Sequence, residues 1–232
     1  MRIPRTIHQT WKDRHIPPEL DEMAYSWKKW HPDWQYVLWT DDMNRNFIQQ
    51  YFPYFLPTYD GYEKNIQRVD AVRYFVLYQF GGLFIDLDFE CLANIEPALG
   101  DADCVFGKEP EEHCIIHGKN MIISNAFMGC VPQCPFLGVV CEELTKERDI
   151  TDHPNDRILE STGPFMLSGT YAMYDRKEDI HLLEPELIYP LSKTELSEYN
   201  KDGWSHLPEE RLKKAFGIHH YAGSWWKKET IV

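Results

Sequence analysis

The sequence predicts an α/β fold in which helices flank a mostly parallel central sheet. In the first half of the chain, short apolar runs typical of strands alternate with helical segments, and this alternation implies strand–helix–strand crossovers. The 232 residues contain no repeat, no low-complexity tract and no linker rich in Gly and Ser. We therefore expect residues 1–232 to form a single domain.

The elements of the first half follow from periodicity and from the residues that end each segment. Asp41 or Asp42 is expected to cap a short helix, and Gly81-Gly82 supplies a left-handed stop for a long one. The expected strands cover residues 3–11, 34–40 and 83–89 (LFIDLDF), and the longer helices cover residues 19–30 and about 63–80.

The second half of the chain gives weaker signals. A short strand is expected over 121–124, a helix over 135–146, a helix beginning near Pro164, and a last strand over 217–221. These segments extend the α/β pattern without fixing the order of the strands.

Composition excludes some functions. With 24 Lys and Arg against 37 Asp and Glu, the net charge is −13, so the protein repels phosphate backbones and we expect no nucleic-acid partner. Aromatic residues make up 14% of the chain, including 8 Trp and 13 Tyr. Flat amphipathic rings of this kind suit contacts with nucleobases and sugars.

Three features of the sequence bear on the cellular compartment: the most apolar stretch, the N-terminal residues and the cysteines. Its most apolar stretch, residues 74–89, is interrupted by Gly and Asp, so we expect no transmembrane segment. The N-terminal residues lack the apolar core of a secretion signal. Six cysteines without a compact framework are expected to be buried thiols in a reducing, cytoplasmic location. Closely spaced His113, Cys114 and His117 resemble a zinc pattern, but loop residues are the simpler interpretation.

Asp86-Leu87-Asp88 is the central chemical signal. In a strand, alternate side chains point to the same side, which places both carboxylates together. Carboxylates at the carboxyl end of a strand lie where open α/β sheets bind ligands. Hard oxygen ligands suit Mg²⁺ or Mn²⁺ carrying a diphosphate, so the sequence predicts a metal site there.

Two further segments carry candidate site residues. Asp70 and Arg73 share a face of the preceding helix, where they form either an ordinary salt bridge or a carboxylate and a guanidinium for sugar and phosphate. Near the C-terminus, HHYAGSWW supplies His219 or His220, of which alternation allows only one to face the ligand side. The other interpretation of this segment is an aromatic tail that packs on the core.

Four segments together are similar to one enzyme family: IPRTIHQTW (3–11), VDAVRYFVLYQFGGLFIDLD (69–88), STGP (161–164) and HHYAGSW (219–225). They resemble the DXD-containing sugar transferases of glycosyltransferase family 32, which include yeast mannosyltransferases and, more distantly, large clostridial glucosylating toxins. The resemblance implies a GT-A-type, Rossmann-like domain that binds a nucleotide sugar.

The resemblance also implies roles for individual residues. Trp11 resembles the ring that stacks on the donor base, and Asn125 a contact on the sugar side. Ser224 and Trp225 resemble a loop that closes over the phosphates. The core of the site is implied to consist of donor contacts, catalytic groups and metal ligands: Asp70, Arg73 and Asp86 for the donor, Asp86, Asp88 and Arg73 for catalysis, and Asp88 with His220, preferred over His219, for the metal.

These inferences predict a metal-dependent glycosyltransferase. We expect it to move a hexosyl group from a UDP- or GDP-sugar to an acceptor hydroxyl on a glycan, with Mn²⁺ (or Mg²⁺), as in polysaccharide biosynthesis. The resemblance implies retention of configuration, and the sequence offers no dedicated nucleophile or base. Two alternatives remain open: a metal-dependent sugar nucleotidyltransferase, and a non-catalytic carbohydrate-binding module that uses the aromatic residues alone.

Overall fold

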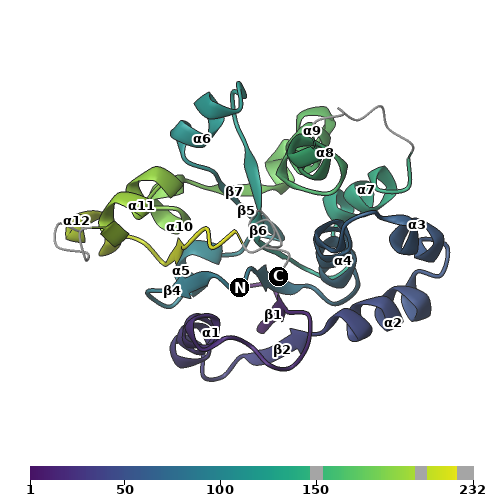
Figure 1. The fold of residues 1–232 in the computed structure, drawn as a ribbon, viewed down its shortest axis with the longest axis horizontal. Helices are drawn as coiled ribbons and strands as arrows, with labels where there is room; N and C mark the ends of the chain where they lie inside the picture. Colours follow the sequence, from purple (N-terminus) through teal and green to yellow (C-terminus); the bar gives the residue numbers. More distant parts are fainter. Residues whose placement is uncertain (147–153, 202–207, 224–232) are drawn as a thin grey trace, which may run out of the picture.

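A computed structural model describes residues 1–146, 154–201 and 208–223 (Figure 1). Within them a six-stranded sheet has the order β2-β1-β3-β6-β5-β7. Five of its strands run in one direction, and β6 alone is antiparallel to both neighbours. The mostly parallel sheet is therefore confirmed. Its strands are β1 (Thr6–Thr10), β2 (Gln35–Trp39), β3 (Gly82–Ile85), β5 (Cys104–Lys108), β6 (Ile123–Cys130) and β7 (His181–Leu183).

Helices cover both faces of this sheet, as expected for strands buried on both sides. One face carries α2 (Asp41–Tyr51), α3 (Leu56–Gly61), α4 (Asn65–Phe80), α7 (Pro135–Glu143) and α9 (Pro164–Met173), with α8 (Pro154–Ser161) packed beside α9. The other face carries α1 (Pro18–Trp30), α5 (Glu96–Leu99) and α10 (Pro185–Ile188). The remaining helices are α6 (Glu111–Ile116), α11 (Lys193–Lys201), α12 (Glu209–Leu212) and a 3₁₀ turn (Lys177–Asp179).

The junction between α4 and β3 positions the site. Most of α4 is buried, so its orientation is fixed by packing rather than by an amphipathic face. Gly81 ends the helix with φ +66°, and its N–H donates to the carbonyl of Leu77 (2.8 Å). A Cβ on Gly82, where φ is +94°, would lie 2.6 Å from the carbonyl oxygen of Thr6. Glycine is therefore required where β3 enters the sheet beside β1.

The acidic motif lies in a turn, where a continuous strand was expected. β3 ends at Ile85, and β4 (Phe89–Cys91) begins after Asp86-Leu87-Asp88. The N–H of Asp86 donates to the carbonyl of Ala126 (2.8 Å), and the N–H of Phe89 donates to the carbonyl of Asp86 (3.2 Å). The expectation of strand alternation through this motif is wrong, because the chain turns there and leaves the large sheet.

A second, two-stranded sheet follows this turn. β4 pairs with β8 (Gly217–His219), the expected last strand, in an antiparallel arrangement. The C-terminal part of the described chain thus lies directly beside the acidic turn (Figure 1).

Several element boundaries differ from expectation. Thr40, rather than Asp41 or Asp42, caps α2 by accepting a hydrogen bond from the N–H of Met43 (3.3 Å). β6 begins at Ile123, and it extends to Cys130 through Gly129, where a Cβ would lie 2.4 Å from Leu83. Among the residues that the structure describes, no helix combines the length and apolar character needed to cross a membrane.

Candidate active site

A cavity of about 710 Å³ opens at the edge of the sheet where β1, β3 and β5 end. The residues that directly follow these strands, Trp11, Asp86 and Glu109, all line it. Because β6 runs in the opposite direction, its first residues, including Ser124 and Asn125, reach the same edge. Ligands bind at the carboxyl ends of strands in open α/β sheets, so this cavity is the candidate active site.

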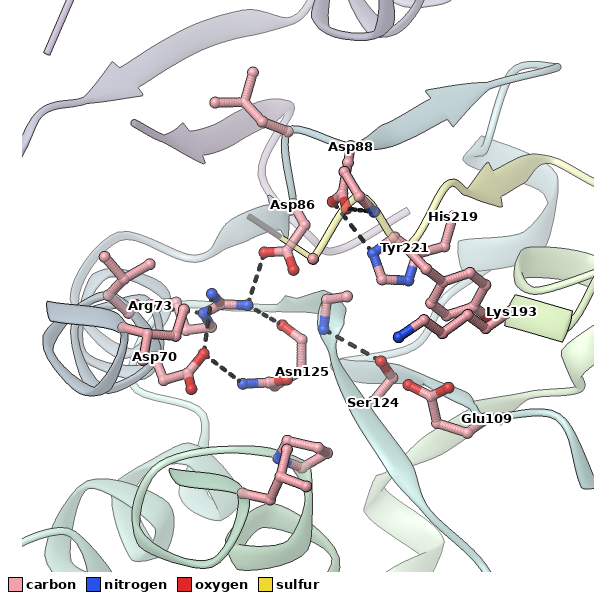
Figure 2. A pocket seen from close by; sticks show the side chains of 18 of the residues that line it. Asp70, Arg73, Asp86, Asp88, Glu109, Ser124, Asn125, Lys193, His219 and Tyr221 are labelled. Atoms are coloured by element: carbon pink, nitrogen blue, oxygen red, sulfur yellow. Dashed lines mark hydrogen bonds and ion pairs between the residues drawn. The ribbon is translucent and has the colours of Figure 1, made fainter. Parts of the chain in front are cut away.

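Arg73 joins the helix α4 to the acidic turn (Figure 2). Its Nη2 lies 3.1 Å from Oδ1 of Asp70, and its Nη1 donates to Oδ1 of Asp86 (2.8 Å) and to the carbonyl of Asn125 (2.7 Å). Asn125 in turn donates from Nδ2 to Oδ1 of Asp70 (3.0 Å). The Arg73 side chain is only 3% exposed, and Asp70, Arg73, Asp86 and Asn125 all line the cavity.

The STGP segment (161–164) forms hydrogen bonds with Asp70 and with two other residues of α4. The Thr162 hydroxyl donates to Oδ2 of Asp70 (3.4 Å), and the Tyr74 hydroxyl donates to the carbonyl of Thr162 (3.0 Å). Gln67, one turn before Asp70 on α4, donates to the hydroxyl of Ser161 (2.9 Å). This segment therefore fixes the position of Asp70.

Burial has the largest effect on the pKa values of Asp70 and Asp86. It raises the pKa of Asp70 to about 7, against the opposing effects of Arg73 and the hydrogen bonds from Asn125 and Thr162. Burial also raises the pKa of Asp86, while Arg73 opposes the rise and Asp88 adds to it. A bound cation would relieve the close approach of the two carboxylates.

Asp88 has the opposite balance. Although burial favours its neutral form, His219 and the N–H of Ala222 lower the pKa of Asp88 to about 2. Oδ1 of Asp88 lies 3.2 Å from Nε2 of His219, and Oδ2 accepts from the Ala222 N–H (2.8 Å). Burial opposes the charged form of His219, but Asp88 raises its pKa above the usual value. Asp88 and His219 thus favour each other's charged forms across this contact.

The donor atoms suit a divalent metal ion. Asp86, Asp88 and His219 each offer one ligand atom, and these atoms lie within 4.8 Å of one another. Two carboxylate oxygens with one imidazole nitrogen match the preferences of Mn²⁺, and Mg²⁺ also accepts such oxygens. The three residues therefore fit the metal that the motif implies.

The structure brings His219, rather than the expected His220, to the carboxylates. His219 is the residue paired with Phe89 in the β4–β8 ladder, and its ring stacks on Phe89 with centroids 5.3 Å apart. Nε2 of His220 lies 3.0 Å from Oε2 of Glu90, while its backbone N–H donates to the carbonyl of Asp88 (2.8 Å). The ladder register therefore turns His220 away from the metal ligands.

The other expected residues are distributed as follows. Trp11 is half-buried in the cavity wall, and its Nε1 atom is buried with no hydrogen-bond partner within the described residues. Asn125 lies in the Arg73 network described above. Ser224 and Trp225 lie outside the described residues.

Sequence reasoning missed Glu109, Ser124 and Tyr221 as cavity residues. Glu109 follows the apolar run CVFGK (104–108) in the same way that Asp86 follows LFI (83–85). Ligands bind at the carboxyl ends of strands in open α/β sheets, so the position of Glu109 in the sequence already indicated a site residue. The three closely spaced residues of the zinc-like pattern do not form a metal cluster within the described chain, and His113 bonds Glu109 instead.

Known proteins are similar to this chain in sequence. Residues 17–106 match the family described as the glycosyltransferase sugar-binding region containing a DXD motif. An inositol phosphoceramide mannosyltransferase of Schizosaccharomyces pombe is 38% identical over 175 residues, which are 75% of this chain and 48% of the relative. A mannosyl phosphorylinositol ceramide synthase of Saccharomyces cerevisiae is 33% identical over 222 residues, 94% of this chain and 55% of the relative. The chain spans about half the length of these relatives.

A solved structure shares the fold. The PaToxG glycosyltransferase has a TM-score of 0.52 at 15% identity, and the match covers 72% of this chain and 68% of that one. The resemblance carried by the motifs is therefore confirmed: the chain is a relative of the DXD-containing sugar transferases and has their GT-A-type fold.

Proposed function

We propose that the protein is a metal-dependent glycosyltransferase. It transfers a hexosyl group from a nucleoside diphosphate sugar, a UDP- or GDP-sugar, to an acceptor hydroxyl. The observation that carries this proposal is the placement of Asp86, Asp88 and His219 beside the Arg73 network in one cavity. The names of the relatives favour mannose as the transferred sugar.

Several residues that line the cavity have a proposed role toward the donor. Asp88 and His219, with Asp86, hold Mn²⁺ or Mg²⁺. Asp70 and Asn125 bind hydroxyls of the donor sugar, and Trp11 stacks on the base. The buried Trp11 Nε1–H, which has no partner within the described residues, supports a ligand at this wall, because buried donors are normally satisfied.

The chemistry follows from charge. The bond between the sugar C1 and the diphosphate oxygen breaks, a bond from C1 to the acceptor oxygen forms, and the acceptor proton passes to the leaving phosphate. The proposed role of Arg73, which two carboxylates and a carbonyl hold in the cavity wall, is to neutralise charge on the leaving group. A bound divalent metal supplies the same stabilisation as a Lewis acid. We propose retention of configuration with this route.

A donor panel tests the proposal. The protein is incubated with UDP- and GDP-sugars and Mn²⁺, and free nucleoside diphosphate is measured together with the melting temperature. We expect one donor to raise the melting temperature in the presence of Mn²⁺ and to release nucleoside diphosphate. Release of pyrophosphate instead would support a nucleotidyltransferase. Binding of sugars without any effect of nucleotides would support a carbohydrate-binding module.

The remaining parts of the proposal concern the whole protein. We propose that residues 1–232 act as one domain and that the acceptor is a glycan or another polyhydroxylated group. The names of the relatives, which include inositol phosphoceramide, favour a polyol acceptor. A cytoplasmic location stays a prediction; all six cysteines are buried thiols.

A further inference from the structure

The cavity has a second wall that the donor roles do not use. Glu109, directly after β5, lies across the cavity from Asp70 and Arg73, with Tyr221 on its own side (Figure 2). Its side chain is 12% exposed, so the carboxylate is largely buried yet remains accessible to a ligand in the cavity. Its hydrogen-bond partners are His113 on α6 and Ser124 on β6, which are not members of the Arg73 network.

The orientation of Glu109 is fixed by its neighbours. The backbone N–H of Lys193 donates to Nε2 of His113 (3.1 Å), so the proton of the neutral imidazole is on Nδ1. Nδ1 of His113 then donates to Oε2 of Glu109 (2.7 Å). Burial opposes the charged form of Glu109, but hydrogen bonds from His113 and Ser124 hold its pKa below the usual value. The carboxylate is therefore a pre-oriented, ionised hydrogen-bond acceptor.

This wall adjoins the reaction centre. The Tyr221 ring lies between the two histidines, with its centroid 5.1 Å from that of His113 and 4.3 Å from that of His219. One aromatic ring therefore separates the partner of Glu109 from the metal-ligating His219. A molecule resting on this wall would therefore lie close to the proposed metal site.

We propose that Glu109 is an acceptor-binding residue, which accepts hydrogen bonds from the hydroxyls of a sugar or cyclitol ring and so orients the attacking hydroxyl. This inference rests on the proposed function. An ionised carboxylate binds hydroxyls more strongly than a neutral group does. If the acceptor lacked the matching hydroxyl, the largely buried Glu109 carboxylate would lose that hydrogen bond. The site therefore selects for polyols. The proton of the attacking hydroxyl still passes to the leaving phosphate, so Glu109 orients the acceptor without taking that proton.

Separate measurement of donor hydrolysis and of transfer tests this assignment. Nucleoside diphosphate release is measured first without acceptor and then with methyl α-D-mannopyranoside or myo-inositol as the probe. Glu109→Gln keeps the shape but removes the charge, and Glu109→Asp keeps the charge but retracts it. Glu111→Gln, an exposed glutamate two positions away, is the matched control.

We expect Glu109→Gln to raise the KM for the probe about tenfold, equivalent to about 1.4 kcal/mol. Donor hydrolysis should stay within about twofold, because no donor contact is lost. Glu109→Asp should give a smaller rise in KM, and Glu111→Gln none. An unchanged KM in a folded Glu109→Gln or Glu109→Asp variant would overturn the assignment, as would a parallel loss of donor hydrolysis. Failure of the proposed function is distinct, because the unmodified protein would then release no nucleoside diphosphate.

Discussion

Nη1 of Arg73 lies 2.8 Å from Oδ1 of Asp86, and the same nitrogen lies 2.7 Å from the carbonyl oxygen of Asn125. One buried guanidinium thus joins α4, the acidic turn and β6. Arg73 binds an oxygen of Asp86, whereas Asp88 pairs with His219. The two acidic residues of the motif therefore have different partners and are expected to respond differently to mutation.

Removing the Asp88 carboxylate should remove metal-dependent turnover. We expect Asp88→Ala to lower the rate of nucleoside diphosphate release at least about a hundredfold, since it deletes a ligand for the charge that stabilises the leaving group. The far-UV circular dichroism spectrum should stay unchanged. Glu90→Gln, whose side chain contacts His220 outside the cluster, is the control. Full activity of the wild type in excess chelator would contradict the metal site.

The two adjacent histidines provide a matched pair. His219→Ala should weaken Mn²⁺ binding by at least about tenfold, because it removes a nitrogen that lies within 4.8 Å of both carboxylate ligand atoms. His220→Ala should leave Mn²⁺ affinity within about twofold, because His220 bonds Glu90. Isothermal titration with Mn²⁺ measures both. Stronger loss in His220→Ala would mean that the ladder register changes when the metal binds.

Trp11 and Trp39 separate donor binding from stability. Trp11→Ala should weaken donor binding by about 1–3 kcal/mol, the range for stacking of a base on an aromatic ring. Trp39→Ala should instead lower the free energy of unfolding by about 3–5 kcal/mol, because Trp39 is buried and donates to Nδ1 of His8 (3.1 Å). Donor affinity and melting temperature are measured for both variants. Loss of stability alone in Trp11→Ala would assign Trp11 to the core.

Local signals and long-range contacts explain which features the sequence predicted. The helix before Gly81-Gly82 and the strand after it were predictable, because periodicity and a glycine stop are local. The turn at Asp86 was not, because it depends on a hydrogen bond to Ala126, which is distant in sequence. Side-chain alternation could not decide whether His219 or His220 faces the ligand side, since only the pairing with β4 sets the register. Glu109 was missed because one acidic residue after a short apolar run is a weak signal.

His8 should contribute a loss of stability in mild acid, whereas Asp70, whose pKa burial raises to about 7, contributes in the opposite direction. Nδ1 of His8 accepts from Trp39, and Nε2 lies 3.0 Å from the carbonyl oxygen of Gly81, so a second ring proton has no acceptor. Burial lowers the pKa of His8 from 6.5 to about 4. Between these values the unfolded chain binds a proton at His8 that the folded chain does not. His8 therefore makes the free energy of unfolding decrease as the pH is lowered.

The contribution of His8 over the whole interval is a loss of about 3.5 kcal/mol, at about 1.4 kcal/mol for each pH unit between the two pKa values, and it is obtained as the difference between the wild type and His8→Gln. Urea unfolding at pH 7, 6, 5 and 4.5 measures it. His8→Gln should show a smaller decrease over this range, whatever its stability at pH 7. His15→Gln, which alters a side chain that is 95% exposed, should keep the wild-type decrease. Equal slopes in the wild type and in His8→Gln would exclude His8 as the cause.

The pairing of β4 with β8 also sets the order in which the protein becomes competent during its synthesis. Every strand of the large sheet, together with Asp86 and Asp88, precedes β8 in the chain, whereas His219, the third residue of the proposed metal site, lies at the end of β8. All strands of the sheet and both carboxylates are therefore synthesised before the segment that completes the cavity wall and the proposed metal site. Premature termination before residue 217 would yield a protein with the sheet and both carboxylates but without the histidine.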